Sequence, residues 1–531
     1  MDSIRIRNFR SIGDSKNIRI NKINLLLGRN SSGKSSFVRL FPMLRATAKN
    51  ELRGPVLWFD ENYDFGSFNN TLCRHRDEGD DCIMFGFSWT REDSKKVHEE
   101  YYPTKRPSGV FRNAKIFTLN MYIGQVGDRT ILKKIELQAD DHMVVIAAEN
   151  NKANSFAANF DGRRLNVGNS NWDYTTKGIL PNITFEDWSQ PVYEVNELLF
   201  KHIPSQKLDL SLITAIRDVF DTDDANRERI FDRIVYLIDK QCGYKLDDFT
   251  MDSDDFNTIC DFIIIEHIIN TLFYVDRTLT DDFNHSYYIT PLRYNNERYM
   301  RNQDLSVDNI ESSGKNVMEY ILSLKEREKN SYLEFLQKTL KCKIEVLGQD
   351  TKSIFITNEL GETDNIVDVG HGYSQILPIA TMLWDRAYKG NSRRNQDYIV
   401  IEQPEVHLHP YMQGRIAVLL YEALSLAEKR SNNLRFIIET HSPVLVNRLG
   451  KFIYNNNLGR QLEEISKLKK SDGTSIEYRL SDLDIDDSIK IKPEDVSVYL
   501  FNKDENGLTE ITNTEYDESG RVKQWPIGFL D

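Results

Sequence analysis

Apolar and polar residues alternate at the start of the chain, over 3–9, and a denser apolar run follows at 23–28. Alternation predicts a half-buried strand, and a continuous apolar run predicts a strand in the centre of a sheet. A loop rich in glycine and serine comes next, and apolar residues then recur with helical spacing. Pro42 lies inside that helical pattern, so we expect the helix to kink or to end early.

Two different patterns fill the middle of the chain. Between 55 and 150, alternating segments rich in aromatic residues predict antiparallel strands. Between 190 and 285, apolar residues have helical spacing, which predicts a helical insertion. Its most apolar segment, 261–275, carries Glu266 and His267 in its middle, so we interpret it as a buried helix and not as a membrane span.

The later part of the chain alternates between strand and helix patterns. The expected strands are 287–294, 342–348, 353–359 and 434–440, and the expected helices are 316–341, 374–388 and 411–430. From 451 onward the pattern is one of short strands and turns. We expect the strand–loop–helix segment that begins at 23 and the late strand–helix–strand block to meet in one sheet, which predicts an α/β fold with the middle of the chain as an excursion.

The composition narrows the class of protein. With 531 residues, 40% of them hydrophobic and 28% charged, the chain has the makeup of a globular protein with more than one packing unit. The start lacks the apolar core of a signal peptide, so we expect a cytoplasmic protein with no membrane contact. The net charge of −13 leaves any contact with DNA or RNA to a local basic patch or to a partner. The 5 cysteines are widely spaced, which favours reduced thiols over a disulfide framework or a zinc ribbon.

The glycine- and serine-rich loop has the form of a P-loop. Gly28–Ser35 fits the pattern G-x-x-x-x-G-K-[ST] between an expected strand and an expected helix, which is the context that this motif requires. The glycines let backbone N–H groups turn toward a phosphate, a lysine neutralises its oxygens, and a serine hydroxyl completes a magnesium shell. We therefore predict that ATP and Mg²⁺ are bound by Gly28, Asn30, Ser31, Gly33, Lys34, Ser35 and Ser36.

A second apolar run, 398–401, ends in Glu402 and has the form of a Walker B strand. The terminal carboxylate of such a strand helps to hold magnesium, so we predict Ser35 and Glu402 as metal ligands. Gln403 lies where the acid that activates water is usually found, and an amide cannot take up a proton. Glu405 is the nearest alternative base, and Glu402, Gln403 and Glu405 are the catalytic candidates on this segment.

His407 and His409 follow, and together with Glu405 they invite a zinc site. Pro404 and Pro410 mark a loop, however, and no fourth ligand is evident. We interpret the histidines as residues that shape the loop or contact a subunit.

Two further segments could reach a phosphate. In 367–383, Gly370 and Gly372 precede Ser374 and an apolar helix, so Ser374 suits an N-cap position at a second anion-binding turn. In 435–449, a strand ends in Glu439, Thr440 and His441, and a helix is expected to begin near Ser442 and Pro443. A polar side chain at such a strand end can reach a γ-phosphate, which makes His441 a further catalytic candidate.

Taken in order, these motifs resemble those of the ABC-type ATPases of the SMC, RecF and OLD kind, in the compact AAA family branch without coiled coils. The segments that carry the resemblance are IRNFRSIGD, LLLGRNSSGKSSF, PLRY, VGHGYSQILPI, IEQPEVHLHP, ETHSPVLVNRL and the C-terminal WPIGFLD. Residues 55–285 match only loosely. Within the branch, the chain is most similar to the PtuA ATPases of Septu-type anti-phage systems and of certain retrons.

The resemblance implies a division of the chain. It places an N-terminal ATPase lobe at 1–185, a helical insertion at 186–286, a C-terminal ATPase lobe at 287–450, and strands and turns at 451–531. It also implies that two heads dimerise head to tail, or form a higher homo-oligomer. Gly372 and Ser374 of one subunit would then contact the γ-phosphate held by the P-loop of the other. His441 matches the switch histidine, and the departure at Gln403 predicts slow ATP hydrolysis.

Many OLD-type relatives carry a C-terminal nuclease domain, for which the residues after His441 leave too little room. We interpret the acidic segment 480–488 as a solvated loop. The resemblance implies that a separate HNH-type nuclease, similar to PtuB, is a partner, and in retrons also a reverse transcriptase with its RNA–DNA product. The function expected is a regulatory ATPase that controls such a nuclease. The alternatives are a RecF-like ATPase that binds DNA itself and a non-hydrolysing nucleotide sensor or scaffold.

Overall fold

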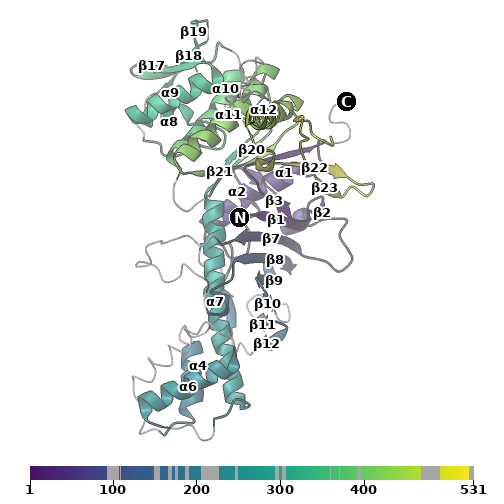
Figure 1. Cartoon of the computed structure of the whole chain (residues 1–531), viewed down its shortest axis with the longest axis vertical. Coiled ribbons are helices and arrows are strands. Elements are labelled where there is room, and N and C mark those ends of the chain that lie inside the picture. Colours follow the sequence, from purple (N-terminus) through teal and green to yellow (C-terminus); the bar gives the residue numbers. More distant parts are fainter. Residues whose placement is uncertain are drawn as a thin grey trace. The chain divides into compact units, whose positions relative to one another are not determined.

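The computed structural model describes residues 1–91, 107, 109–148, 156–165, 170–173, 177–185, 190–204, 226–244, 249–293, 298–301, 306–358, 360–369, 371–390, 396–467 and 491–525. The chain forms two compact units (Figure 1). Unit 1 comprises Met1–Ile18, Met43–Asp60 and Asp64–Asn284, and unit 2 comprises Arg19–Pro42, Glu61–Tyr63 and His285–Asp531. The P-loop thus packs with residues from the second half of the chain.

Unit 1 contains an antiparallel run of strands in the order β12-β11-β10-β9-β8-β7-β1-β2. The strands are β1 (Ser3–Phe9), β2 (Ile12–Asp14), β7 (Ile83–Thr90), β8 (Ile116–Val126), β9 (Arg129–Ala139), β10 (His142–Ala148), β11 (Phe156–Phe160) and β12 (Arg163–Leu165). All neighbouring strands of this run pair antiparallel, which confirms the prediction from the alternating pattern. One side of this run is apolar and buried, as Ile4 and Ile6 of β1 show.

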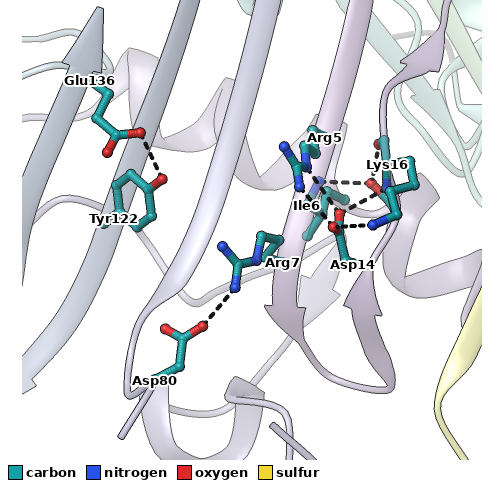
Figure 2. A network of polar contacts seen from close by, with 9 residues as sticks. Arg5, Ile6, Arg7, Asp14, Lys16, Asp80, Tyr122 and Glu136 are labelled. Atoms are coloured by element: carbon teal, nitrogen blue, oxygen red, sulfur yellow. Dashed lines mark hydrogen bonds and ion pairs between the residues drawn. The ribbon is translucent and has the colours of Figure 1, made fainter. Parts of the chain in front are cut away.

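The other side of the same strands carries paired charges (Figure 2). Arg5 donates two hydrogen bonds to Asp14, of 3.0 and 2.8 Å, and Arg7 donates one of 2.9 Å to Asp80. Further along, Tyr122 donates a 2.8 Å hydrogen bond to Glu136. We refer to Arg5, Arg7, Asp14, Asp80, Tyr122 and Glu136 as the polar face of unit 1.

The helical insertion contains α4 (Gln190–Phe200), α6 (Arg227–Cys242) and α7 (Asp254–Asn284). By length and composition α7 could cross a membrane, but its apolar window is mostly buried inside the protein. Ile263 and His267 are both fully buried. This confirms the interpretation of the segment as a buried helix, because the core helix of a globular protein has these properties. The remaining short elements before α4 in the described part of the chain are β3 (Ile18–Arg19), β5 (Phe59–Asp60), β6 (Tyr63–Asp64), α3 (Phe68–Thr71), the 3-10 helix η2 (Gly109–Phe111), β13 (Ser170–Asp173) and β14 (Asn182–Phe185).

Unit 2 contains strands in the order β23-β22-β4-β21-β20-β15. They are β4 (Ile23–Gly28), β15 (Ser286–Ile289), β20 (Gln396–Glu402), β21 (Asn433–Glu439), β22 (Val496–Lys503) and β23 (Thr509–Thr514). β4 pairs in parallel with both β21 and β22, so the strand before the P-loop joins the late strands, as predicted. β22 and β23 are antiparallel, which makes the sheet mixed and confirms the α/β fold class.

The helices of unit 2 cover this sheet with a continuous apolar core. The P-loop leads into α1 (Lys34–Val38), after which the chain enters α2 (Leu40–Lys49), most of which belongs to unit 1. The first helix therefore ends early, as Pro42 predicted. The later elements are α8 (Val317–Ser323), α9 (Glu326–Leu340), β16 (Met300–Arg301), β17 (Lys343–Leu347), β18 (Thr351–Thr357), β19 (Thr363–Asn365), α10 (His371–Lys389), α11 (Pro410–Lys429) and α12 (Pro443–Lys467).

Three sequence predictions need correction. The single helix expected over 316–341 is two helices, because Leu324 adopts an extended conformation between α8 and α9. The expected strand 287–294 ends at Ile289. The segment from 451, expected as strands and turns, begins inside α12, which continues to Lys467. Residues 480–488 lie outside the described residues.

Candidate functional site

The P-loop follows β4 and depends on glycine at two positions. A Cβ atom at Gly28 would lie 2.2 Å from the carbonyl oxygen of Phe501, so no larger residue fits beside β22. Gly33 has a φ of +95°, in the left-handed region that glycine favours, and directly precedes α1. Asn30 and Ser31 are exposed, Ser36 is half-buried, and Ser31 also has a positive φ of 63°. The loop thus has the turned backbone that its sequence predicts.

Lys34 is buried and directed back at its own loop. Its Nζ donates hydrogen bonds to the carbonyl oxygens of Gly28, at 2.9 Å, and Arg29, at 2.8 Å. The same atom lies 3.9 Å from Oε1 of Glu439. Burial lowers the pKa of the Lys34 ammonium, and the charge of Glu439 partly opposes that effect. A phosphate would replace two carbonyl oxygens as the partner of this cation.

The parallel strands β20 and β21 place two carboxylates side by side. Glu402 and Glu439 are register partners at the ends of these strands, and both are buried. Ser35 Oγ donates a 2.9 Å hydrogen bond to Oε1 of Glu439, while Oε2 of Glu439 is buried without a hydrogen-bond partner. Burial, and next the charge of Glu402, raise the pKa of Glu439 to about 7. An unpartnered buried carboxylate oxygen beside a P-loop serine fits a divalent cation.

Glu402 has different partners from Glu439. Arg39, just after α1, donates two hydrogen bonds to its carboxylate, of 2.9 and 2.7 Å. The hydroxyl of Tyr288, on β15, donates a third. Burial raises the pKa of the Tyr288 hydroxyl, and the neighbouring charge of Glu402 adds to that effect. The predicted Walker B acid is therefore held by protein donors.

Gln403 begins the loop after β20 with a φ of +45°, in the left-handed region. Its backbone N–H donates to the carbonyl oxygen of Glu439, at 2.9 Å. Its own carbonyl oxygen accepts a 3.1 Å hydrogen bond from Arg293, whose guanidinium also donates to Pro404 and Glu402 carbonyl oxygens at 3.4 Å. Burial lowers the pKa of Arg293 to about 10. A buried cation thus fixes the backbone on which Gln403 stands, and such unusual backbone geometry is concentrated at functional sites.

Glu405 is joined to the segment that follows β21. Thr440 Oγ1 donates a 2.8 Å hydrogen bond to Oε2 of Glu405, and the backbone N–H of His441 donates to Oε1. Burial raises the pKa of Glu405, although the hydrogen bond from His441 opposes the shift. Burial, and next the charge of Lys34, lower the pKa of His441 to about 4, so its imidazole is neutral at neutral pH. The structure therefore brings together Glu402, Gln403, Glu405, His441 and the P-loop.

The two loop histidines are exposed. Nδ1 of His409 accepts a 3.3 Å hydrogen bond from the backbone N–H of Tyr411 and caps α11. Within the described part of the chain, no group of three or more His, Cys, Asp or Glu side chains could hold a metal ion. The role of His409 as a helix cap fits its interpretation as a loop-forming residue.

The glycine-rich segment is placed differently from its prediction. Gly370 lies outside the described residues, and α10 begins at His371, so Ser374 lies in the first turn and is not the N-cap. Gly372 is half-buried, and a Cβ there would meet only Leu408, at 4.0 Å. Gln375 donates a 3.5 Å hydrogen bond to the carbonyl oxygen of Arg293, which connects this turn to the Gln403 loop. The contact of Gly372 and Ser374 with a second subunit's nucleotide stays a prediction.

Four residues at this site were missed as functional candidates: Arg39, Tyr288, Arg293 and Glu439. Glu439 had a signal in the sequence, because it ends an apolar strand just as Glu402 does. Arg39 and Tyr288 carried none, since a lone arginine or tyrosine does not reveal its partner.

Comparison with known proteins assigns the family. The model of the AAA ATPase domain family matches residues 1–446, and the chain belongs to this family. Residues 491–531 match a second family, described as a protein of unknown function. The family shows that the chain is an ATP-binding protein with a P-loop ATPase domain. No curated protein matches the chain.

Solved structures of SMC heads are similar over nearly the whole chain. An SMC head bound to the C-winged helix domain of ScpA has 10% identity and a TM-score of 0.37, with 98% of each chain covered. The SMC head domain from Thermotoga maritima has 10% identity and a TM-score of 0.34, covering 96% of this chain and 98% of that one. An SMC head from Pyrococcus furiosus, bound to the C-terminal domain of ScpA, has 9% identity and a TM-score of 0.33, covering 97% and 96%. The fold assignment itself rests on the strand order of unit 2.

Proposed function

We propose that the chain is an ATP-operated switch that binds Mg²⁺-ATP and hydrolyses it slowly. The observation that carries this proposal is the position of Gln403, directly after Glu402 at the end of β20. Its backbone is fixed by hydrogen bonds to Glu439 and from Arg293, so its place in the site is defined. An amide side chain can orient a water molecule by hydrogen bonding but cannot remove its proton.

Glu405 is the carboxylate that could substitute as a base. Its raised pKa suits it to accept a proton, but both of its oxygens accept hydrogen bonds from Thr440 and His441. These hydrogen bonds favour the ionised carboxylate and so reduce its basicity, which makes Glu405 a weak base for this step. Glu405 also couples the Gln403 loop to His441, so a phosphate contact at His441 would be felt on that loop.

Single-turnover hydrolysis of ATP tests the slow-switch proposal. Gln403→Glu should raise the rate by on the order of 100-fold, because a positioned general base contributes about that much. Glu405→Gln should lower the slow wild-type rate. The matched control is Glu422→Gln, because Glu422 is a buried glutamate on α11 that pairs with Lys338, and this variant should keep the wild-type rate. A fast wild-type rate that Gln403→Glu leaves unchanged would contradict the proposal.

We further propose that the switch is the regulatory subunit of an anti-phage defence complex. Support comes from the sequence resemblance to PtuA, in the segments from the P-loop to the strand-end histidine. In this proposal the chain assembles head to tail with itself and restrains a separate HNH-type nuclease like PtuB, with a retron reverse transcriptase and its RNA–DNA as a further partner. The nucleotide state would decide whether the nuclease is restrained.

Purification with and without the product of a neighbouring nuclease gene tests this finer proposal. The expected result is a complex whose nuclease activity changes with ATP, while the isolated chain does not cleave DNA. Cleavage by the isolated chain that is lost in Glu402→Ala would overturn it. ATP-dependent and steeply salt-sensitive binding of duplex DNA by the chain alone would instead favour a RecF-like repair ATPase.

A further inference from the structure

Two buried carboxylates stand next to each other at the ends of β20 and β21, and their partners differ. Glu402 and Glu439 are register partners on adjacent parallel strands, so their side chains lie on the same side of the sheet. A Walker B strand is ordinarily identified by its terminal acid, which would select Glu402. The hydrogen bonds around the two residues indicate instead that Glu439, and not Glu402, is the residue available to bind a metal ion.

Glu439 is the acid in contact with the P-loop. Ser35, the residue expected to complete the shell of a bound magnesium ion, donates its 2.9 Å hydrogen bond to Oε1 of Glu439. Lys34 lies 3.9 Å from that same oxygen. The side chain of Glu439 is 2% exposed, and its Oε2 is buried without a hydrogen-bond partner. A native buried carboxylate oxygen left without a donor is rare and needs an explanation, such as an ion.

Both oxygens of Glu402, in contrast, already accept hydrogen bonds from protein donors. Arg39 binds both of its oxygens in the bidentate arrangement typical of arginine and a carboxylate, and Tyr288 donates to Oε2 as well. A cation ligated directly by Glu402 would have to compete with a guanidinium that already neutralises it. The arrangement identifies Glu402 as the anchor of Arg39 and Tyr288.

We propose that Glu439, together with Ser35, holds the divalent cation of the bound nucleotide, while Glu402 orders the residues around it. This inference rests on the ATP-binding part of the proposed function and assigns its metal-side acid. The cation would supply the positive charge that Oε2 of Glu439 lacks and would join the phosphates to the end of β21. His441 stands two residues further along the same segment, so metal binding at Glu439 and phosphate contact at His441 would act on one stretch of chain.

Equilibrium binding of ATP to the full-length chain, measured in EDTA and in excess Mg²⁺, tests the assignment. The measured quantity is the factor by which Mg²⁺ tightens binding, which does not depend on turnover. Glu439→Gln keeps the shape of the side chain and an oxygen for Ser35, and it should reduce that factor by about 10- to 100-fold. Glu402→Gln should reduce it less, and Glu422→Gln on α11 should leave it unchanged.

The outcomes separate the inference from the function on which it rests. If the wild type does not bind ATP at all, the proposed function fails. If the wild type binds Mg²⁺-ATP and Glu439→Gln retains the full Mg²⁺ effect, then Glu439 is a protonated structural carboxyl and the inference is overturned. If Glu402→Gln loses more of the Mg²⁺ effect than Glu439→Gln, the metal-side acid is Glu402 and the inference is likewise overturned. Because Gln is the neutral isostere of a protonated Glu, Glu439→Gln is expected to fold, and its thermal melting is the check.

Discussion

The polar face of unit 1 and the strand ends of unit 2 both contain partly or fully buried carboxylates, but the pKa of Asp14 in the first is lowered and that of Glu439 in the second is raised. Burial opposes ionisation of Asp14, but hydrogen bonds from Arg5 and Lys16 outweigh it and hold the pKa of Asp14 well below its ordinary value. At the strand ends, burial and the charge of Glu402 raise the pKa of Glu439 to about 7. The carboxylates of the polar face have protein partners, whereas the strand ends keep a buried carboxylate oxygen, Oε2 of Glu439, without a hydrogen-bond partner, which a ligand could satisfy.

The largest effect on ATP affinity is expected from removing the buried lysine of the nucleotide site, Lys34. Lys34→Ala should weaken ATP binding by on the order of 100-fold, because each hydrogen bond to a charged group contributes about 1.5–3 kcal/mol. Lys134→Ala, which removes the lysine beside Glu136 on the sheet of unit 1, should leave ATP affinity unchanged. Equilibrium binding measurements check both variants. An equal loss of ATP affinity in the two variants would contradict the assignment of nucleotide binding to unit 2.

Removing the arginine that pairs with a carboxylate should lower the free energy of unfolding more in unit 2 than in unit 1. Arg39→Ala leaves the buried carboxylate of Glu402 with Tyr288 alone and should cost about 2–3 kcal/mol in the free energy of unfolding. Arg5→Ala breaks a pair that is partly exposed on both sides and should cost about 1 kcal/mol or less. Urea unfolding of the two variants measures the difference, and equal costs would contradict the ranking.

The pH dependence of stability should have opposite signs in the two regions. Glu439 has a raised folded pKa, so its folded form retains the proton, and stability should fall as pH rises from about 4.5 to about 7, by on the order of 2 kcal/mol. Glu439→Gln does not titrate, so the wild type should lose stability relative to this variant across that window. Thermal melting of both proteins from pH 5 to 7.5 checks the sign. A wild type that gains stability relative to the variant would contradict it.

Asp14 is expected to have the smallest effect on stability, and its pH dependence should be opposite in sign to that of Glu439. Its lowered pKa means that its contribution is present above its ordinary pKa of 3.8 and is lost as pH falls below that value. Asp14→Asn removes the anion for Arg5 and Lys16 and should cost about 1 kcal/mol at neutral pH, since the pairs are partly exposed. The cost should shrink below pH 4, as chemical denaturation at the two pH values would show.

The sequence allowed the P-loop and the Gln403 segment to be predicted because each is a continuous motif with a local conformation. Gly28 and Gly33 stand where the turned backbone requires them. The importance of Glu439 depends on the register of β20 and β21, which bring together residues 37 positions apart (439 − 402). Such pairings, like that of Arg39 with Glu402, arise from packing and leave no local pattern.

The boundaries of helices were predicted less well than their existence. The pattern of 316–341 gave no sign that Leu324 would turn extended, because the apolar spacing continues across the break. An N-cap at Ser374 would start the helix at residue 375, whereas α10 starts four residues earlier, at His371, so Ser374 lies in its first turn. The first error divides one expected helix into two and the second shifts the start of a helix by one turn, and neither changes the strand order of unit 2.

The central claim is that the ends of β4, β20 and β21 form a site that binds ATP and holds it without prompt hydrolysis. The most direct measurement is to incubate the wild-type chain with ATP and Mg²⁺, remove unbound nucleotide by gel filtration, denature the protein and identify what is released. We expect the bound nucleotide to be ATP. Recovery of mainly ADP, or of no nucleotide, would contradict it.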